Sequence, residues 1–127
     1  MKFDNNPFTL TDKSVIIPSD TILERTVLGL MITSPEALEV GMQHLGYSYF
    51  PNIDNNNRAI FHAMTLLHNE GINVDIVTVS GKLKELKLFS AVGGVEYLSA
   101  IAEEAITYSA IKDYCLKLRD LDLLRKA

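Results

Sequence analysis

The residues of this sequence that could take part in chemistry are few. Gly93 and Gly94 are adjacent, and a glycine turn before a helix can hold a phosphate through its backbone N–H groups. A P-loop needs Gly-x-x-x-x-Gly-Lys-[Ser/Thr], which does not occur among the 127 residues. The pair also lacks a following Lys and comes after a helical pattern rather than a strand. We interpret it as an inter-helix turn, because glycine reaches positive φ at low cost.

Histidine, glutamate and cysteine side chains give no metal-binding or catalytic pattern. The three histidines are His44, His62 and His68. His62 and His68 are six residues apart on one predicted helix and face different ways, and no His-Glu-x-x-His occurs. Glu103 and Glu104 are neighbours, which point apart on a helix. Cys115 is the single cysteine and lies on an apolar stripe, where we expect a small buried hydrophobe. We therefore expect no catalytic, metal or cofactor site here.

Charge and hydropathy narrow the class of protein further. The sequence has 16 acidic and 12 basic residues, a formal net charge of −4. The basic residues that recur late, Lys112, Lys117, Arg119, Arg125 and Lys126, alternate with aspartates. We interpret them as a solvated helix face, since an acidic domain gains little from counterion release on DNA. A lone cysteine and the absence of an apolar run of about 18 residues favour a cytoplasmic protein with no membrane partner.

The elements that must position these residues are all predicted to be helices. The chain fits one domain, residues 18–127, after a flexible N-terminal arm over residues 1–17. The six predicted helices begin near Ser19 or Thr21, at Ser34-Pro35, near Asn57, at Asp75, after Gly93-Gly94 and at Thr107. Ser34 and Asp75 are typical helix caps, and Gly46 and Gly71 follow predicted helix ends. Inward positions are predicted to include Ile22, Val27, Ile60, Met64, Val79, Leu83, Val95, Leu98 and Ile101. The fold class is therefore all-α, a compact bundle of about six helices.

The last predicted helix carries two apolar stripes. Cys115, Leu118 and Leu121 lie on the inward stripe. Leu116 and Leu123 are seven residues apart and are rotated well away from it. We expect them, with the neighbouring Leu124, to form an interface with a partner helix or another subunit. Because neither a glycine cap nor a proline follows, we expect this helix to be truncated from a helical hairpin.

Several segments, in this order, resemble the N-terminal collar domain of DnaB-type replicative DNA helicases. The matching segments are Thr26-Val27-Leu28-Gly29, Pro35-Glu36-Ala37-Leu38, Arg58-Ala59-Ile60-Phe61, Val74-Asp75-Ile76-Val77-Thr78-Val79, Val92-Gly93-Gly94 and Leu118-Arg119. The resemblance covers about residues 18–125. It implies a hexameric ring that unwinds duplex DNA with ATP and Mg²⁺ held in a separate motor domain, absent from this chain. It implies a non-catalytic module that pairs with other helicase subunits and docks primase and a helicase loader, meeting DNA only through the full-length ring.

Three other functions are compatible with a helical domain. The helicase-binding domain of a primase has a related helical fold, but the Val-Asp-Ile-Val-Thr and Val-Gly-Gly segments argue against it. A small helical enzyme would need a cluster of polar residues that the sequence does not offer. A DNA-binding domain is disfavoured by the net charge, and strong salt-sensitive binding of duplex or forked DNA would favour it again.

Overall fold

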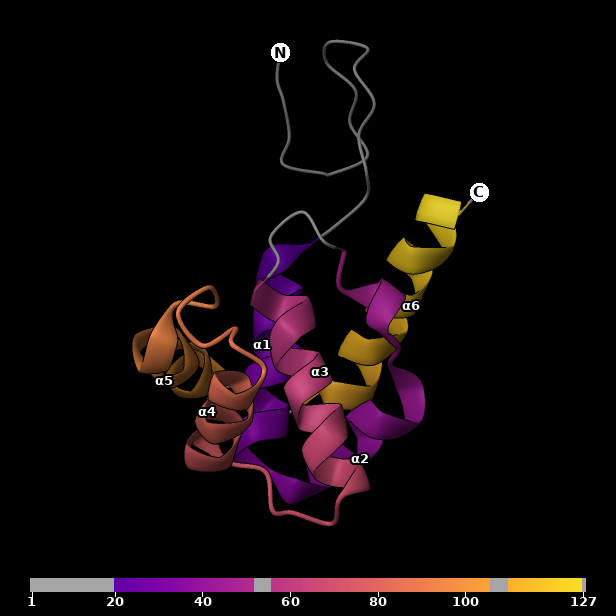
Figure 1. Cartoon of the computed structure of the whole chain (residues 1–127). Coiled ribbons are helices and arrows are strands. Elements are labelled where there is room, and N and C mark those ends of the chain that lie inside the picture. Colours follow the sequence, from indigo (N-terminus) through magenta and orange to yellow (C-terminus); the bar gives the residue numbers. More distant parts are fainter. Residues whose placement is uncertain (1–19, 52–55, 106–109, 127) are drawn as a thin grey trace, which may run out of the picture.

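Every regular element that the structure describes is helical, as predicted. The structure is a computed structural model, and it describes residues 20–51, 56–105 and 110–126. The elements are α1 (Thr21–Thr33), α2 (Pro35–His44), the 3₁₀ turn η1 (Tyr47–Tyr49), α3 (Asn56–Asn69), α4 (Ile76–Glu85), α5 (Gly94–Ala105) and α6 (Ile111–Lys126). Figure 1 shows α1 in the middle of the bundle, with α4 and α5 on one side and α6 on the other. The predicted arm over residues 1–17, Ser19 and Thr107 lie outside the described residues.

Side-chain caps fix where three helices begin. Asp75 Oδ1 accepts a hydrogen bond from Thr78 N at 2.8 Å, and Thr78 Oγ1 accepts one from Asp75 N at 2.9 Å, so α4 has the predicted capping box. Ser34 Oγ accepts from Ala37 N at 3.1 Å, as predicted for α2. α1 begins at Thr21, one of the two predicted starts, but its cap is Asp20, whose Oδ1 accepts a hydrogen bond from Leu23 N.

Two helices end in a left-handed residue. Gly71 has φ of 75° after α3, and Ile72 N donates to Leu67 O at 2.9 Å, which closes the helix in a Schellman motif. The same pattern ends α4, where Leu88 N donates to Leu83 O at 2.9 Å. There the left-handed position holds Lys87, with φ of 62°. An L-residue pays a steric cost in this conformation that glycine avoids.

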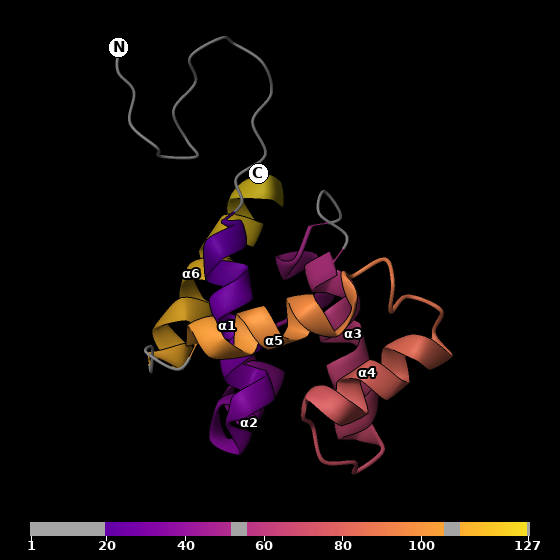
Figure 2. The same cartoon turned by 90° about the vertical axis from the view of Figure 1, so that its left-hand side faces the viewer.

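The core forms where α1 crosses its neighbours. Fully buried side chains come from each helix except α2, and they include Val27, Met31, Ile60, Met64, Val79, Leu83, Leu98, Ile101 and Leu118. Figure 2 shows α5 lying across α1. At this crossing a Cβ on Gly29 would lie 2.1 Å from the carbonyl oxygen of Ile101. Only glycine therefore allows the two backbones to approach so closely.

Two residues predicted to face inward are exposed. Ile22 is 74% exposed, because it lies about 140° around α1 from the fully buried Val27. Val95 is 46% exposed and lies in the first turn of α5, next to the glycine turn. The remaining inward positions named from the sequence, from Val27 to Ile101, are buried as predicted.

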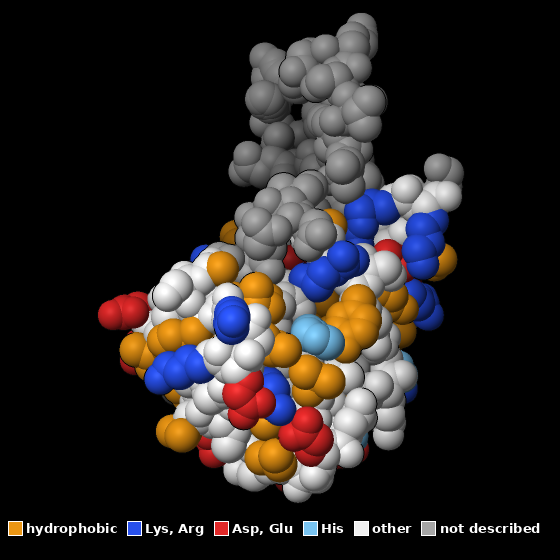
Figure 3. Space-filling model, in the orientation of Figure 1, with side chains coloured by type: hydrophobic (Ala, Val, Ile, Leu, Met, Phe, Trp, Pro, Cys, Tyr) orange, Lys and Arg blue, Asp and Glu red, His pale blue; other side chains and the backbone are white. Residues whose placement is uncertain are grey.

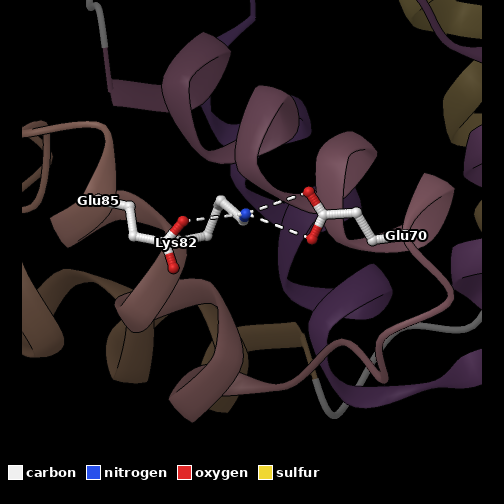
Figure 4. A network of polar contacts seen from close by, with 3 residues as sticks. All are labelled: Glu70, Lys82 and Glu85. Atoms are coloured by element: carbon white, nitrogen blue, oxygen red, sulfur yellow. Dashed lines mark hydrogen bonds and ion pairs between the residues drawn. The ribbon is translucent and has the colours of Figure 1, made fainter.

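A lysine joins the end of α3 to α4. Lys82 Nζ lies 3.2 Å from Glu70 Oε2 and 3.1 Å from Glu85 Oε1 (Figure 4). The hydrogen bonds that Lys82 donates to these two carboxylates, first to Glu85 and then to Glu70, raise the pKa of Lys82 above its ordinary value of 10.5. The lysine side chain is only 12% exposed, whereas both glutamates reach into solvent. The cluster is therefore a cross-link at the edge of the bundle rather than a catalytic group.

Candidate interaction surface

The glycine pair forms the predicted turn between α4 and α5. Gly93 and Gly94 have φ of 100° and 65°. Their N–H groups donate to Ser90 O and Phe89 O, both at 3.0 Å. Since both donors are used within the turn, neither points to a phosphate. The interpretation as an inter-helix turn is confirmed.

His62 and His68 contact different side chains and do not form a common site. His62 Nδ1 lies 2.8 Å from the hydroxyl of Tyr47, and His68 Nε2 lies 3.0 Å from Glu39 Oε2. His44 closes α2 and is half-buried. Within the ranges that the structure describes, no three His, Cys, Asp or Glu side chains gather in a way that could hold a metal ion.

The remaining candidates for chemistry have structural surroundings. Glu103 and Glu104 are both exposed on α5, and Glu104 Oε2 accepts a hydrogen bond from Arg25 Nη2 at 2.6 Å. Cys115 is fully buried, and desolvation raises the pKa of its thiol from 9.0 to about 11. The thiol is therefore neutral at pH 7 and acts as a small core side chain, as predicted.

The two apolar stripes of α6 meet different surroundings. Cys115, Leu118 and Leu121 are buried against the bundle. On the outer stripe Leu123 is 57% exposed, and Leu124 beside it is 49% exposed. Leu116 is half-buried. The three leucines named from the sequence thus lie away from the buried stripe, and we call Leu116, Leu123 and Leu124 the α6 leucine face.

A buried aspartate near the end of α6 was missed by the sequence analysis. The side chain of Asp122 is only 5% exposed, and its two oxygens lie 3.5 Å from Arg125 Nη2 and 3.0 Å from Lys126 Nζ. Arg125 Nη2 also donates to the carbonyl oxygen of Ser48 in η1 at 2.7 Å. These contacts tie α6 to η1 while its leucine face points away. In the sequence Asp122 reads as one charge of a solvated face, so only the packing reveals its role.

A second missed cluster joins three helices through polar side chains. Glu24 of α1 is 1% exposed, and its Oε1 accepts a hydrogen bond from Asn57 Nδ2 of α3 at 2.9 Å. Tyr97 of α5 donates from its hydroxyl to Asn57 Oδ1 at 2.7 Å. Buried hydrogen bonds between side chains of different helices fix how those helices pack. No local pattern of the sequence connects residues 33 and 40 positions apart, so this cluster could not be predicted from the sequence.

Comparison with known proteins assigns the fold to a class. The family model described as the DnaB-like helicase N terminal domain matches residues 17–120. A solved structure, the N-terminal domain of DnaB helicase from Mycobacterium tuberculosis, is similar with a TM-score of 0.79 and 26% identity, covering 87% of this chain and 77% of that one. The class defined by the fold is thus the helical N-terminal domain of a replicative helicase.

Curated relatives agree with this class. The replicative DNA helicase DnaC of Bacillus subtilis is 31% identical over 109 residues, which are 86% of this chain and 24% of the relative. The replicative DNA helicase DnaB of Geobacillus stearothermophilus is 31% identical over 111 residues, 87% and 24% of the two chains. The chain belongs to the family of DnaB-like helicase N-terminal domains. It spans about a quarter of the length of these relatives.

The family assignment decides between the alternatives left by the sequence. It favours a helicase domain over the helicase-binding domain of a primase.

Among the helices that the structure describes, none has both the length and the apolar character that crossing a membrane requires.

Proposed function

We propose that this chain is the collar domain of a replicative DNA helicase, and that it serves assembly and docking. In this proposal the whole protein is a hexameric ring in the cytoplasm that unwinds duplex DNA at the replication fork. ATP and Mg²⁺ act in a motor domain outside this chain. The relatives named as replicative DNA helicases support this assignment, since the chain matches a similar share of each.

The observation that carries the assembly role is the α6 leucine face. Leu123 and Leu124 are about half exposed on a helix whose opposite side is buried in the bundle. Burying a leucine side chain contributes about 1.5–3 kcal/mol, and part of this is lost to the ordering that association requires. We propose that a helix of another helicase subunit covers this face. Primase and a helicase loader would then dock on the assembled collar.

Charges beside the leucines would select the orientation of that helix. At 100° per residue, Lys112, Arg119 and Lys126 fall on one flank of Leu116 and Leu123, and Asp113 and Asp120 fall on the other. All five are exposed. Facing helices of a coiled coil select their partner and direction through such flanking charges. A partner helix with acidic residues along the basic flank would fit, whereas one with basic residues there would be repelled.

A chimaera tests the proposal. The N-terminal domain of the Geobacillus stearothermophilus relative is replaced by this chain, and ring assembly is measured by native mass spectrometry together with unwinding of a forked DNA. We expect a ring from the parent chimaera and smaller species from Leu123→Glu. Val77→Glu is the matched control, because Val77 is 78% exposed on α4. Equal assembly of both variants would contradict a role of the leucine face, and a chimaera that never forms a ring would contradict the collar assignment.

The isolated chain gives a second test. We expect it to be monomeric or weakly dimeric in light scattering and to hydrolyse no ATP. A tight hexamer of the chain alone, or nucleotide turnover by a clean sample, would contradict the proposal.

A further inference from the structure

An exposed tyrosine with fixed basic neighbours lies on η1, away from the leucine face. Tyr47 is 41% exposed, and its ring meets Phe61 and His62 edge-on, with centroids 5.4 and 5.3 Å away. Its hydroxyl lies 2.8 Å from His62 Nδ1. The ring is therefore held in place before any partner arrives, with part of its surface open to solvent.

Two arginines from different helices converge on this turn. Arg58 Nε of α3 donates to the carbonyl oxygen of Tyr47 at 3.1 Å. Arg125 of α6 donates to Ser48 O at 2.7 Å. Among the described residues, the two terminal amino groups of Arg58 have no acceptor. A guanidinium fixed through Nε presents these N–H groups in the geometry that suits a carboxylate or phosphate.

The surroundings of the tyrosine are positively charged although the whole chain is acidic. Its basic neighbours are Arg58, Arg125 and Lys126. The buried carboxylate of Asp122 pairs with Arg125 and Lys126, and the Lys126 side chain is still 62% exposed. Figure 3 shows basic side chains gathered on this face, over η1 and the C-terminal end of α6, with acidic side chains lower down. We call Tyr47, Arg58, His62, Arg125 and Lys126 the η1 patch.

We propose that the η1 patch docks an acidic segment of another protein. An aromatic or aliphatic side chain of that segment would lie against the open part of Tyr47, and its carboxylates would bind Arg58 and Lys126. Tyrosine and arginine are the residue types that dominate binding energy at protein interfaces, and arginine clusters recognise acidic motifs. The inference does not rest on the helicase assignment. It uses none of the α6 leucines, and Lys126 is the one residue that the η1 patch shares with the charged flank of the leucine face.

Nucleic acid fits the patch less well. Proteins that hold single strands stack successive bases on several rings along a basic groove, whereas this patch exposes the one tyrosine ring beside a histidine. The net charge of −4 also opposes a long polyanion. A carboxylate-bearing peptide needs only the local charge and one ring.

Fluorescence anisotropy with the intact chain tests this proposal. The probe is a labelled short peptide of alternating Glu and Phe, and the same peptide with Gln in place of Glu reports the charge requirement. We expect Arg58→Gln to weaken binding of the Glu peptide about tenfold, the loss of one hydrogen-bonded charge contact. Added salt should weaken it as well. Lys84→Gln is the control, because Lys84 lies on α4, over the ring of Phe89, and its replacement removes one positive charge outside the η1 patch.

The ring is tested separately from the charge. We expect Tyr47→Phe to bind within about twofold of the parent, because it keeps the ring. Tyr47→Ala should bind about tenfold more weakly while its circular dichroism spectrum remains that of the folded chain. The proposal is overturned if the Glu peptide does not bind, or if Arg58→Gln and Lys84→Gln bind it equally. It is also overturned if oligothymidine binds more tightly than the peptide, or if Arg58→Gln abolishes self-association of the chain instead.

Discussion

The close contact between α1 and α5 at Gly29 can be tested with three glycine substitutions that differ in their surroundings. Gly29, Gly41 and Gly81 all lie inside helices, where replacing glycine by alanine gains about 1 kcal/mol in helix propensity. A Cβ on Gly29 would meet the backbone oxygen and carbon of Ile101 at 2.1 and 2.8 Å. On Gly41 it would meet the side chain of Met31 at 2.6 Å, and on Gly81 it would meet nothing within 4 Å.

These surroundings predict changes of opposite sign in the free energy of unfolding for Gly29→Ala and Gly81→Ala. An ordinary contact needs at least 3.4 Å, so α1 and α5 would have to separate by about 1 Å in Gly29→Ala. Overpacking of this kind costs about 1–3 kcal/mol or more. The clashing atoms belong to the backbone of Ile101, which cannot move aside as a flexible side chain can. We therefore expect Gly29→Ala to lower the free energy of unfolding by about 2 kcal/mol after the propensity gain. Gly81→Ala should raise it by about 0.5–1 kcal/mol. Gly41→Ala should fall between them, because the Met31 side chain is flexible.

Urea denaturation followed by far-UV circular dichroism gives these free energies. The slope of free energy against urea should stay constant across the series, since the surface exposed on unfolding hardly changes. A Gly29→Ala variant as stable as the parent would refute the close approach of α1 to α5. A destabilised Gly81→Ala variant would refute the open surroundings of Gly81.

Three further predictions concern single residues. Lys87→Gly should raise the free energy of unfolding by about 1 kcal/mol in urea, because Lys87 has φ of 62°, and Lys87→Ala should not. Cys115 should resist thiol reagents in the folded chain. Its raised pKa means that stability falls as the pH rises from 9 towards 11, where the unfolded thiol ionises before the folded one, and Cys115→Ala should lack this fall. Asp122→Ala should lower the free energy of unfolding by about 2 kcal/mol in thermal denaturation, because it takes the buried carboxylate away from the charge of Arg125. Asp120→Ala, at a side chain that is 61% exposed, should lower it by under about 0.5 kcal/mol. Equal losses for the two variants would contradict the burial of Asp122.

Much of the helix plan follows from the sequence because caps and apolar spacing are local signals. The Asp75–Thr78 box and the Ser34 cap act over three residues, so they can be recognised without knowing the fold. Local signals also compete. Asp20 caps α1 although Ser19 and Thr21 offered similar chemistry, and the hydrogen bond that decides between them depends on backbone geometry.

The sequence by itself determined the class of fold, the two faces of α6 and the family, since these depend on periodicity and on the order of short segments. Only the tertiary structure decided which polar side chains are buried and which meet. Glu24 with Asn57, and Arg125 with Ser48, are joined across 33 and 77 residues. Such pairs depend on how the helices cross, and that crossing is set by many weak contacts summed over the whole core rather than by any local pattern.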